Sequence, residues 1–539
     1  EDVKHLYDKE RPHHSLDSIN GLVLWLDAEN VDGKNNTTLY DQAAIDQWKD
    51  LSGNGNDLIE HPGTDTPIYK KTGFNETKST VYFDANDILH AADNYPHPFR
   101  MNRMTIYVVG NNNIDESSNV WRGSFISKYG EITSSGEYAG WKIRRWGGST
   151  QLAFTLEGNS ESKSMLDEVD GIYTAVYDGV NKVFWANGQL EAKTPHTKDV
   201  GYNDTHLAIG GYFNESNSPD GHMKGEISEI IVFNRALDSD ERRIVNNYLS
   251  NKWTLTLTVD SDGDGFTDAV EQLKGSIPTD NNSIPTGIPS VLGQAKLWLD
   301  ASNIDGDNNS SLSDGDAVSE WKDLSVNRND AVQDTNSQQP TYESTGFNGL
   351  PSVDFIRANE NYVNVPNTLL SKPNLHYYAV IRSDSTSNQA VFSKHIDDGS
   401  NQLITGFWNN DSGKVWHINL HSSAYLSEPV VTQFSEYMIL EYILEKSGSN
   451  YLASVYTNGE IIADKFTMDN TPDLPLSDGK PWSIGQEWDS STKETDEFDG
   501  DIAEFIVFDE VMAEKAEIRS YLANKWGLTT TVDSDGDGL

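Results

Sequence analysis

The chain of 539 residues contains no cysteine, no long apolar run and few basic residues. Without cysteine it forms neither disulfides nor thiolate centres. No stretch approaches the roughly 18 apolar residues of a membrane-spanning helix, so we expect no membrane span. The chain has 40 Lys and Arg residues but 84 Asp and Glu residues, which gives a formal net charge of −44. This excess of acid disfavours nucleic acid and anionic membranes as partners, and it favours cation binding and solubility in salty surroundings.

Aromatic residues, by contrast, are plentiful, with 14 Trp, 23 Tyr and 18 Phe. So many large side chains can fill packed cores, which argues against a disordered acidic chain. At about 100–200 residues per domain, the length predicts two to four domains. The sequence begins at Glu1 without a signal peptide, and we expect any signal to have been cleaved or left out.

Residues 259–272 read VDSDGDGFTDAVEQ and have the spacing of a calcium-binding loop. Calcium takes roughly six to eight oxygen ligands, and a loop of about twelve residues with acids at positions 1, 3, 5, 9 and 12 can surround it. Position 7 offers a backbone carbonyl, and the glycine at position 6, Gly265, permits the sharp turn. The expected ligands are Asp260, Asp262, Asp264, the carbonyl of Phe266, Asp268 and Glu271. The alternative is a solvated acidic linker, since Asp, Ser and Gly are ordinary loop residues.

The flanks of this loop differ from those of a paired EF-hand. The residues after it can form a short helix that ends at Gly275, whereas residues 254–259 (TLTLTV) before it alternate like a strand. The loop therefore resembles the calcium repeats of thrombospondin type 3 and dockerin modules, and this resemblance implies a static structural clamp. A second copy, VDSDGDGL, closes the sequence without its later ligands, so we expect the native chain to continue beyond Leu539. Its expected ligands are Asp533, Asp535 and Asp537.

The chain consists of two copies of one unit. LWLDAENVDGKNN begins at Leu24 and LWLDASNIDGDNN begins at Leu297, 273 residues later. WKDLSGNGND at Trp48 and WKDLSVNRND at Trp321 have the same offset, as do the two acidic phrases. Each copy ends with matching segments, KGEISEIIVFNRAL and YLSNKW in the first and DGDIAEFIVFDEVM and YLANKW in the second. The expected parts are an N-terminal extension (1–19), a first domain (20–257), a calcium loop and linker (258–292), a second domain (293–530) and the start of a second calcium loop (531–539).

Each copy contains many short alternating apolar runs, which indicate β-strands. KVFWANGQL and SVYTNGEII place Asn187–Gly188 and Asn458–Gly459 between such runs, a strong short-range hairpin pattern. One amphipathic helix per copy follows the last run, and Asp238 with Glu241 forms a capping box at the start of the first helix. Its apolar face comprises Ile244, Val245, Tyr248, Leu249 and Trp253, and the second helix keeps Ile518, Tyr521, Leu522 and Trp526. We therefore predict an all-β chain of two tandem antiparallel β-sandwich domains of jelly-roll type, each with one C-terminal helix, plus the calcium-loop linker.

These motifs resemble those of a known family. The LWLDA opening and the GEISEIIVFNRALDSDERRIVNNYLSNKW ending are similar to those of the laminin-G-like (concanavalin A-like) jelly-roll domains of large bacterial surface and secreted proteins. The resemblance covers residues 20–257 and 293–530. It implies a two-sheet antiparallel sandwich, export from the cell, and a role in binding glycans or in building extracellular structures.

Candidate glycan contacts come from tryptophans that do not repeat between the copies. The repeating ones, Trp25/Trp298, Trp48/Trp321 and Trp253/Trp526, are expected in the cores. A sugar site needs exposed aromatic faces and polar side chains that bind hydroxyl groups. GWKIRRWGG (140–148) meets this need, and GFWNNDSGKVWHINLH (406–421) is its counterpart without the arginine pair. The candidates are Trp141, Arg144, Arg145, Trp146, Trp408 and Trp416, and the alternative is a strand with one face buried and its arginines turned outward.

Paired aspartates in the repeated motifs allow two interpretations. The pairs are Asp27/Asp300, Asp32/Asp305, Asp50/Asp323 and Asp57/Asp330. They can form a second calcium site in each sandwich, or they can close Asx turns, and turns are the favoured interpretation.

We expect no enzyme activity from these residues. Jelly-roll glycoside hydrolases use two carboxylates on one strand face. The spacing of three between Glu226 and Glu229, and between Asp501 and Glu504, predicts opposite faces instead. No nucleophile elbow, zinc-protease motif or phosphate loop occurs in the sequence.

The preferred function is a calcium-binding, adhesive or carbohydrate-binding segment of an extracellular surface protein. Two alternatives stay open: a structural repeat of a calcium-stiffened fibre, sheath or matrix, and an accessory binding region of a secreted polysaccharide-degrading enzyme. The expected cofactor is Ca²⁺, and the expected partners are glycans or neighbouring surface proteins, including further copies of the chain. The acidity and the lack of cysteine favour export from a marine or salt-adapted bacterium. Chelation is expected to loosen residues 260–271 and to spare the sandwiches.

Overall fold

The computed structural model describes residues 16–536 with several gaps. The gaps are 17–18, 85, 92–96, 112–122, 132–137, 146–150, 157–159, 164–170, 198–199, 202, 215–217, 395–402, 411–412, 421–424, 430–435, 469–472, 475–479 and 491–492. Residues 131, 160–163, 409–410, 413–415, 419, 425–429, 488–490 and 493–495 are described as backbone only. The chain divides into two compact units, Glu1–Gly263 with Pro278–Asn281 as unit 1 and Asp264–Ile277 with Asn282–Leu539 as unit 2.

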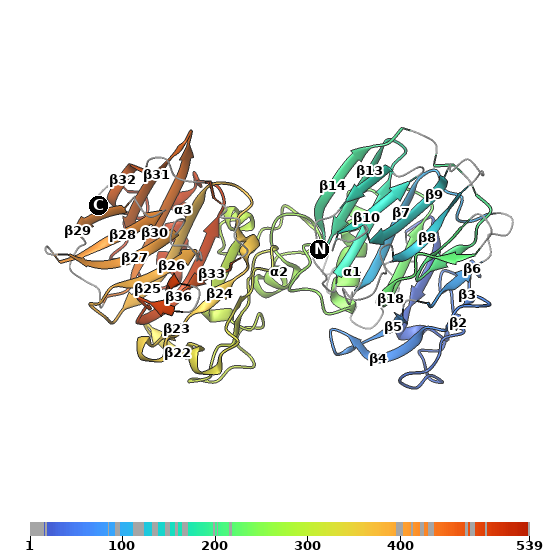
Figure 1. The fold of residues 1–539 in the computed structure, drawn as a ribbon, viewed down its shortest axis with the longest axis horizontal. Coiled ribbons are helices and arrows are strands. Elements are labelled where there is room, and N and C mark those ends of the chain that lie inside the picture. The colour runs from blue at the N-terminus through green and yellow to red at the C-terminus, as the bar shows by residue number, and fades with distance from the viewer. Residues whose placement is uncertain are drawn as a thin grey trace, which may run out of the picture. The chain divides into compact units, whose positions relative to one another are not determined.

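Unit 1 contains two eight-stranded antiparallel sheets (Figure 1). The helix-side sheet has the order β14-β13-β12-β7-β18-β5-β4, with β1 paired to β18. Its strands are β1 (Leu22–Asp27), β4 (Ile68–Phe74), β5 (Lys78–Asp84), β7 (Met104–Asn111), β12 (Gly171–Tyr177), β13 (Asn181–Ala186), β14 (Gln189–Pro195) and β18 (Lys224–Phe233). The opposite sheet has the order β11-β10-β9-β8-β15-β6-β3-β2. Its strands are β2 (Gln47–Trp48), β3 (Leu58–Glu60), β6 (Leu89–Ala91), β8 (Ser124–Glu131), β9 (Tyr138–Arg145), β10 (Leu152–Leu156), β11 (Ser160–Lys163) and β15 (Leu207–Ile209).

Unit 2 repeats this topology. Its helix-side sheet has the order β22-β23-β36-β25-β30-β31-β32, with β19 paired to β36, and its opposite sheet has the order β20-β21-β24-β33-β26-β27-β28-β29. The helix-side strands are β19 (Leu297–Asp300), β22 (Thr341–Phe347), β23 (Leu350–Phe355), β25 (Leu375–Ser383), β30 (Met438–Ser447), β31 (Asn450–Thr457), β32 (Glu460–Met468) and β36 (Gly500–Phe508). The opposite strands are β20 (Glu320–Trp321), β21 (Ala331–Val332), β24 (Val363–Val365), β26 (Gln389–Lys394), β27 (Leu403–Asn410), β28 (Gly413–Leu420), β29 (Tyr425–Pro429) and β33 (Trp482–Ile484).

Smaller elements complete the units. Unit 1 adds the hairpin β16 (Tyr212–Phe213) and β17 (Pro219–Asp220) and the helix α1 (Ser239–Lys252). Unit 2 adds the hairpin β34 (Glu487–Ser490) and β35 (Lys493–Thr495) and the helices α2 (Asp268–Lys274) and α3 (Lys515–Lys525). The described short 3-10 helices are η3 (Ala28–Asn30), η4 (Ser290–Gln294), η5 (Ala301–Asn303), η6 (Asn336–Gln338), η7 (Arg357–Asn359) and η8 (Asn367–Leu369). Among the described helices, none combines the length and the apolar character that crossing a membrane demands.

The predicted fold class is confirmed, because side chains from both sheets of each unit form one apolar core. The three repeating tryptophan pairs lie in these cores, each tryptophan at most 5% exposed. Both Asn-Gly pairs form the predicted hairpins, β13–β14 and β31–β32. Asn187 and Gly188 have φ of 49° and 85°, and Asn458 and Gly459 have φ of 50° and 86°. Two consecutive positive φ values are what a type I′ turn requires.

The helices follow their sequence patterns with two exceptions. Asp238 and Glu241 form the capping box of α1, whereas the start of α3 has no side-chain cap. Ile244, predicted on the apolar face, is 40% exposed, while Val245, Leu249 and Trp253 are buried. The strand predicted at 254–259 is wrong, because these residues turn back on the end of α1. Leu255 donates its amide to Ser250, and Thr258 and Val259 donate to Leu255, so local turns satisfy a backbone that the alternation assigned to a sheet.

The ends of the predicted domains contribute to the cores. Leu16 and Ile19, in the predicted N-terminal extension, belong to the core of unit 1. The predicted linker 258–292 is divided between the units, with 258–263 and 278–281 in unit 1 and the rest in unit 2. In unit 2, Phe266 and Val270 join the apolar core and the Phe266 ring lies 6.4 Å from that of Trp298.

Candidate functional site: the acidic loop and the binding faces

The first acidic phrase brings three of its predicted ligands together. One carboxylate oxygen each from Asp260, Asp262 and Asp264 lies within 4.8 Å of the others, and no other group of three acidic or histidine side chains in the described residues is so close. The predicted ligands Asp268 and Glu271 are not part of this group. Asp260 is fully buried and Asp262 is 8% exposed. Gly263 and Gly265 have φ of 81° and 100°, which allows the chain to turn sharply between the carboxylates.

The predicted exit helix from this loop forms as α2. The Thr267 side chain caps its first turn, and Gly275 ends it with a left-handed φ of 76°. Asp268 and Glu271, the expected ligands at positions 9 and 12, are both fully buried. Glu271 accepts a hydrogen bond from Ser276 Oγ at 3.1 Å, and carboxylates are the oxygen ligands that a hard divalent cation prefers. Phe266, at position 7, has a buried ring and donates its amide to Asp264 Oδ1 at 2.9 Å.

In unit 1 the Asn-Gly hairpin holds the first aspartate of the acidic phrase. The Asp260 amide donates to the Asn187 carbonyl at 3.1 Å, and Gln189 Nε2 donates to Asp260 Oδ2 at 2.7 Å. A Cβ on Gly188 would lie 1.7 Å from the Asp260 carbonyl oxygen, so only glycine fits there. The hairpin pattern was visible in the sequence, but its docking on Asp260 was not.

Unit 2 repeats this anchor on the second acidic phrase. The Asp533 amide donates to the Asn458 carbonyl at 2.8 Å, and a Cβ on Gly459 would lie 1.6 Å from the Asp533 carbonyl oxygen. The loop also begins alike, since Gly536 donates its amide to Asp533 Oδ1 as Gly263 does to Asp260 Oδ1. Asp535 is exposed, and Asp537 lies outside the described residues.

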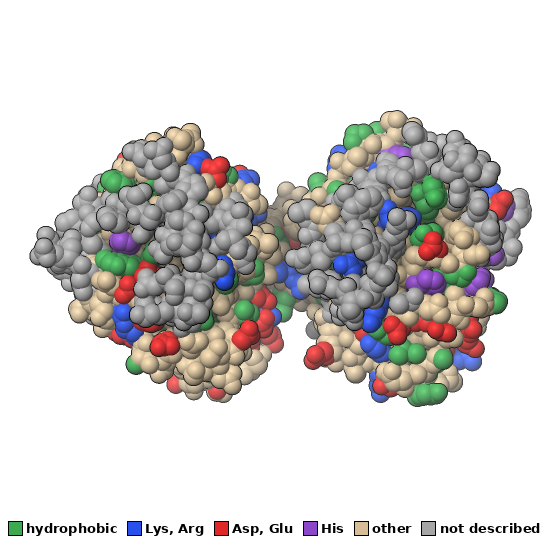
Figure 2. Space-filling model, in the orientation of Figure 1, with side chains coloured by type: hydrophobic (Ala, Val, Ile, Leu, Met, Phe, Trp, Pro, Cys, Tyr) green, Lys and Arg blue, Asp and Glu red, His purple; other side chains and the backbone are tan. Residues whose placement is uncertain are grey.

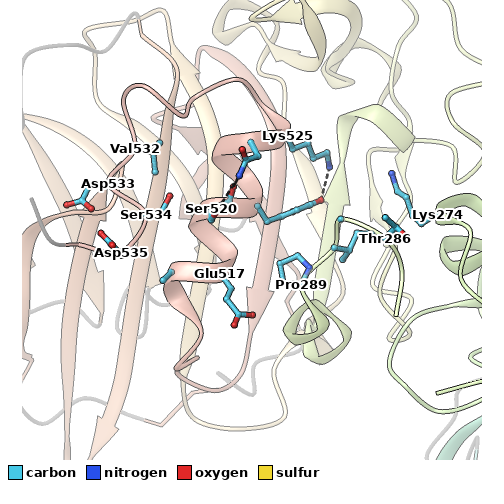
Figure 3. A pocket seen from close by; sticks show the side chains of 15 residues that line it. Lys274, Thr286, Pro289, Glu517, Ser520, Lys525, Val532, Asp533, Ser534 and Asp535 are labelled. Atoms are coloured by element: carbon cyan, nitrogen blue, oxygen red, sulfur yellow. Dashed lines mark hydrogen bonds between the residues drawn. The ribbon is translucent and has the colours of Figure 1, made fainter. Parts of the chain in front are cut away.

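A broad, open cavity of about 1120 Å³ lies beside this second phrase in unit 2. Figure 3 shows Val532, Asp533 and Asp535 on one side of α3, and Thr286 and Pro289 on the other. Tyr521 and Lys525, which belong to the buried cluster described next, line part of it. The cavity is therefore a groove around α3, and no polar group in it points to a particular ligand.

The repeated motifs at the start and end of each copy meet in a buried carboxylate cluster. In unit 1 the cluster comprises Trp25, Asp27, Glu229, Tyr248, Lys252 and Trp253. Glu229 accepts hydrogen bonds from Trp25 Nε1 at 2.7 Å, the Tyr248 hydroxyl at 2.9 Å, Lys252 Nζ at 2.7 Å and Trp253 Nε1 at 2.6 Å. Lys252 also pairs with Asp27 at 2.7 Å. Burial alone would lower the pKa of the Lys252 ammonium, but the two carboxylates raise this pKa above its ordinary value.

Unit 2 contains the same cluster. Glu504 accepts hydrogen bonds from Trp298 Nε1 at 2.7 Å, the Tyr521 hydroxyl at 2.9 Å, Lys525 Nζ at 2.8 Å and Trp526 Nε1 at 2.6 Å. The sequence analysis missed this cluster. The repeat itself carried the signal, because the tryptophans, tyrosine and lysine recur at an offset of 273 residues and the glutamate recurs within the matching segments GEISEIIVF and GDIAEFIVF.

The paired carboxylates on the last strand of each unit lie on one face, contrary to the prediction of opposite faces. A β-bulge between Ile227 and Glu229 shifts the register of β18 against β7, and β36 has the matching shift against β25. Glu229 is occupied by its cluster, and Glu226 pairs with Lys70 at 2.7 Å. In unit 2, Asp501 pairs with Arg382 at 2.6 Å. Each of these carboxylates is therefore already engaged within its own unit.

The paired aspartates close turns, as the favoured interpretation expected. Asp32 accepts from the amides of Lys34 and Asn36, and Asp305 accepts from those of Asp307 and Asn309. Asp50 and Asp323 likewise accept backbone amides. Their donors are Trp25, Ser52 and Asn56 for Asp50, and Trp298, Ser325 and Asn329 for Asp323.

Paired basic residues hold the remaining aspartates. Asp27 and Asp300 pair with Lys252 and Lys525. Asp57 pairs with Lys49, and Asp330 pairs with Lys322. No three of these paired aspartates place their carboxylate oxygens within 4.8 Å of one another, as the aspartates of the acidic loop do.

Trp141 and Trp416, predicted as exposed sugar platforms, are core residues. They are 1% and 0% exposed, and Trp141 Nε1 donates to the Phe99 carbonyl at 3.1 Å. Alternation along β9 and β28 turns these two rings inward, and the sequence alone did not show which set faces the core. Arg144 and Arg145 are only 6% and 8% exposed. Trp146 lies outside the described residues.

Trp408 is the predicted tryptophan that the structure leaves half-buried. Its ring stacks on that of His417 with centroids 4.0 Å apart. Trp408 and His417 lie on the face of β27 and β28 away from Trp416, because neighbouring residues on a strand point to opposite faces.

In unit 1 the outer face of the opposite sheet carries an aromatic and basic patch, formed by Tyr129, Tyr138, Lys142 and Tyr212. Lys142 Nζ lies 3.8 Å from the centroid of the Tyr129 ring and 4.6 Å from that of Tyr212. Tyr138 stacks on Tyr129 at 5.4 Å; Tyr138 and Tyr212 are half-buried, whereas Tyr129 and Lys142 are buried. The residue that GWKIRRWGG contributes to this patch is therefore Lys142, which follows the predicted Trp141 in the sequence.

Three histidines of unit 1 gather around Phe213 on the same outer face. The ring centroids of His61 and His90 are 5.2 Å apart, and those of His90 and His206 are 5.0 Å apart. Figure 2 shows histidine side chains close together in the region where Figure 1 labels β3 and β6. Burial lowers the pKa of His90 to about 4, and the neighbouring imidazoles add to this effect.

Acidification should therefore destabilise unit 1. The unfolded chain binds a proton at His90 near its ordinary pKa of 6.5, whereas the folded unit resists this proton until about pH 4. Stability is thus lost as the pH falls through this window, by about 3 kcal/mol for His90 alone. Calorimetry of the wild type and of His90→Gln across the window measures it. An equal loss in both proteins would contradict this assignment.

Comparisons with known proteins give only a distant likeness. No protein family matches the chain, and no curated protein matches it. A heptameric SAP-like pentraxin from Limulus polyphemus is 22% identical over 30% of this chain and 72% of its own, with a TM-score of 0.24. Domain 4 of AbnA, an extracellular arabinanase of Geobacillus stearothermophilus in complex with arabinotriose, is 14% identical over 42% and 98%, with a TM-score of 0.29. The binding domain of botulinum neurotoxin serotype D/C is 12% identical over 93% and 97%, with a TM-score of 0.32.

Proposed function

We propose that this chain is a non-catalytic, calcium-binding segment of an extracellular surface protein that attaches to glycans. The observation that carries the proposal is the convergence of Asp260, Asp262 and Asp264 within 4.8 Å in a loop of calcium-loop spacing. Three carboxylates at this separation repel one another, and a bound divalent cation offsets that repulsion. Asp268 and Glu271, at the remaining ligand positions, are buried and are expected to complete the site when the cation binds.

The glycan part of the proposal is supported by the outer face of unit 1. Tyr138 and Tyr212 expose part of their rings, whereas Lys142 is only 5% exposed, and Tyr212 also donates to the exposed Asp220 at 2.7 Å. Aromatic faces stack on sugar rings, while a nearby carboxylate accepts hydrogen bonds from hydroxyl groups. In unit 2 the half-buried Trp408, stacked on His417, offers a second and different surface.

Binding to a glycan and polysaccharide array in calcium and in chelator tests this function. We expect calcium-dependent binding to defined sugars, and we expect Tyr212→Ala to weaken it by about tenfold because one aromatic face is lost. Tyr40→Ala is the control, since Tyr40 is 73% exposed and lies outside the patch. Equal weakening by both substitutions would count against the patch, and an array without binding in calcium would contradict glycan attachment.

The duplicated anchor favours a second candidate, a structural repeat stiffened by calcium. In each unit an Asn-Gly hairpin holds the first aspartate of the acidic phrase through an amide hydrogen bond, Asn187 to Asp260 and Asn458 to Asp533. An anchor kept in both copies suits modules that follow one another through calcium loops. This candidate predicts a calcium-dependent rise in melting temperature without any glycan binding.

A further inference from the structure

Unit 1 contains a cavity of about 320 Å³ between α1 and the β13–β14 hairpin, apart from the aromatic patch and from the cluster around Glu229. Arg242, Arg243 and Asn246 line it from the helix, and Thr174 and Trp185 line it from the sheet. A volume of this size suits a ligand no larger than a monosaccharide.

The corresponding position in unit 2 is filled by an ion pair. Thr174 faces Trp185 across β12 and β13 just as Glu441 faces Tyr456 across β30 and β31. Arg519, 273 residues after Asn246, donates from Nε to Glu441 Oε2 at 2.7 Å and lies 4.7 Å from the centroid of the Tyr456 ring. Glu441 also bonds His376 at 3.0 Å. A carboxylate and a guanidinium therefore occupy this place in unit 2.

Unit 1 has a guanidinium here from a different position, Arg242, and has no carboxylate at Thr174. Thr174 and Asn246 are too short to replace the ion pair, and Arg242 instead lies over the Trp185 ring at 4.7 Å from its centroid. Its Nη1 donates to the Leu237 carbonyl at 2.8 Å, and no carboxylate of the described chain forms an ion pair with it. Burial lowers the pKa of this guanidinium, and Arg243 adds to the effect while Tyr107 and Asp238 partly offset it.

Asn246 offers a ligand a hydrogen-bond acceptor in this cavity. Its side chain is 7% exposed, and its Oδ1 has no hydrogen-bond partner in the described part of the chain. A buried acceptor without a partner costs about 1–3 kcal/mol, and a hydroxyl group placed in the cavity would remove that cost. An anion would therefore pair with the Arg242 guanidinium, and a hydroxyl group would donate to Asn246 Oδ1. An apolar ring face would pack against the half-buried Trp185.

We propose that this cavity of unit 1 binds a hydroxylated carboxylate of monosaccharide size, of the uronic acid class. The ligand's carboxylate takes the place that the Glu441 side chain has in unit 2 and pairs with Arg242. A ring hydroxyl donates to Asn246 Oδ1, and the sugar ring lies against Trp185.

Two acidic residues near the cavity set the conditions of the test. Asp240 pairs with Arg243 at 3.2 Å, which leaves Arg242 as the main partner for an anion. Asp262 lines the cavity as well, and its charge would repel a carboxylate unless a cation is bound by the acidic loop. The titration is therefore made in calcium.

Calorimetric titration of the whole chain with sodium glucuronate, and with glucose as the neutral probe, tests the proposal. Glucuronate should bind saturably at one site, and glucose should bind at least about tenfold more weakly, because it has no carboxylate for Arg242. Arg242→Gln should weaken glucuronate binding by about tenfold or more. Lys515→Gln, at the matching position of unit 2, should leave binding unchanged.

A double substitution gives the sharpest test. Thr174→Glu together with Asn246→Arg installs the ion pair of unit 2 and fills the cavity, so it should abolish glucuronate binding while unit 1 keeps its melting transition. Absence of saturable glucuronate binding by the wild type would overturn the proposal. Unchanged binding by either Arg242→Gln or the double variant would overturn it as well.

Discussion

Replacing Glu229 by alanine is expected to destabilise unit 1 by about 3–5 kcal/mol, the range for removing one partner of a buried ion pair. Glu229 is the acceptor for two indole N–H groups, a tyrosine hydroxyl and the Lys252 ammonium, and it is fully buried. Its loss removes the buried acceptor that these four donors share, although Lys252 keeps Asp27. Calorimetry, with the transition of unit 2 as an internal reference, measures the loss.

The duplication supplies the matched experiments for this prediction. Glu504→Ala should destabilise unit 2 by a similar amount, because its four donors have the same identities and nearly the same distances. Glu29→Ala is the control in unit 1, since Glu29 pairs with Lys78 at 3.4 Å with its side chain 39% exposed. A surface pair of this kind contributes about 0–1 kcal/mol. If Glu229→Ala cost no more than Glu29→Ala, the cluster would not hold the two ends of the unit together.

Gly188→Ala is expected to displace the acidic loop. A Cβ at this position would lie 1.7 Å from the Asp260 carbonyl oxygen, and the backbone φ of 85° disfavours any side chain. Asp260 must then move away from the hairpin, which separates it from Asp262 and Asp264. Because such supporting contacts typically affect metal affinity by about 10–100-fold, we expect calcium affinity to fall by that order.

Gly53→Ala separates the steric effect from backbone strain. Gly53 has a φ of 82°, and nothing lies within 4 Å of a Cβ built there. It should cost only the left-handed strain of about 1–2 kcal/mol and should leave calcium affinity unchanged. Equal calcium affinities in the two variants would show that the Asn187–Gly188 hairpin does not position the loop.

The sequence was sufficient for the architecture because its evidence was local or repeated. The two Asn-Gly hairpins and the capping box at Asp238 depend on neighbouring residues, and each corresponds to an observed element. The 273-residue offset corresponds to the topology that the two units share. Residues 254–259 misled the prediction because alternation alone cannot distinguish a strand from turns that pack on a helix end.

The candidate sites were harder to predict because they depend on which face a residue occupies. Trp141 and Lys142 are neighbours on β9, and only the packed sheet shows that the tryptophan faces the core and that the lysine contacts the Tyr129 and Tyr212 rings on the other face. One extra residue, the bulge at Ser228, put Glu226 and Glu229 on the same face. That Thr174 and Asn246 leave a cavity where unit 2 has an ion pair is visible only in a comparison of the two folded units.

The measurement that tests the central claim most directly is a calorimetric titration of calcium into the wild-type chain and into the variant carrying Asp262→Ala and Asp264→Ala. We predict that the wild type binds calcium at the 260–271 loop, that this site disappears from the stoichiometry of the variant, and that both sandwiches keep their melting transitions in chelator. Calcium binding of equal stoichiometry and affinity in the two proteins, or no binding by the wild type, would contradict the assignment of this loop as a calcium site.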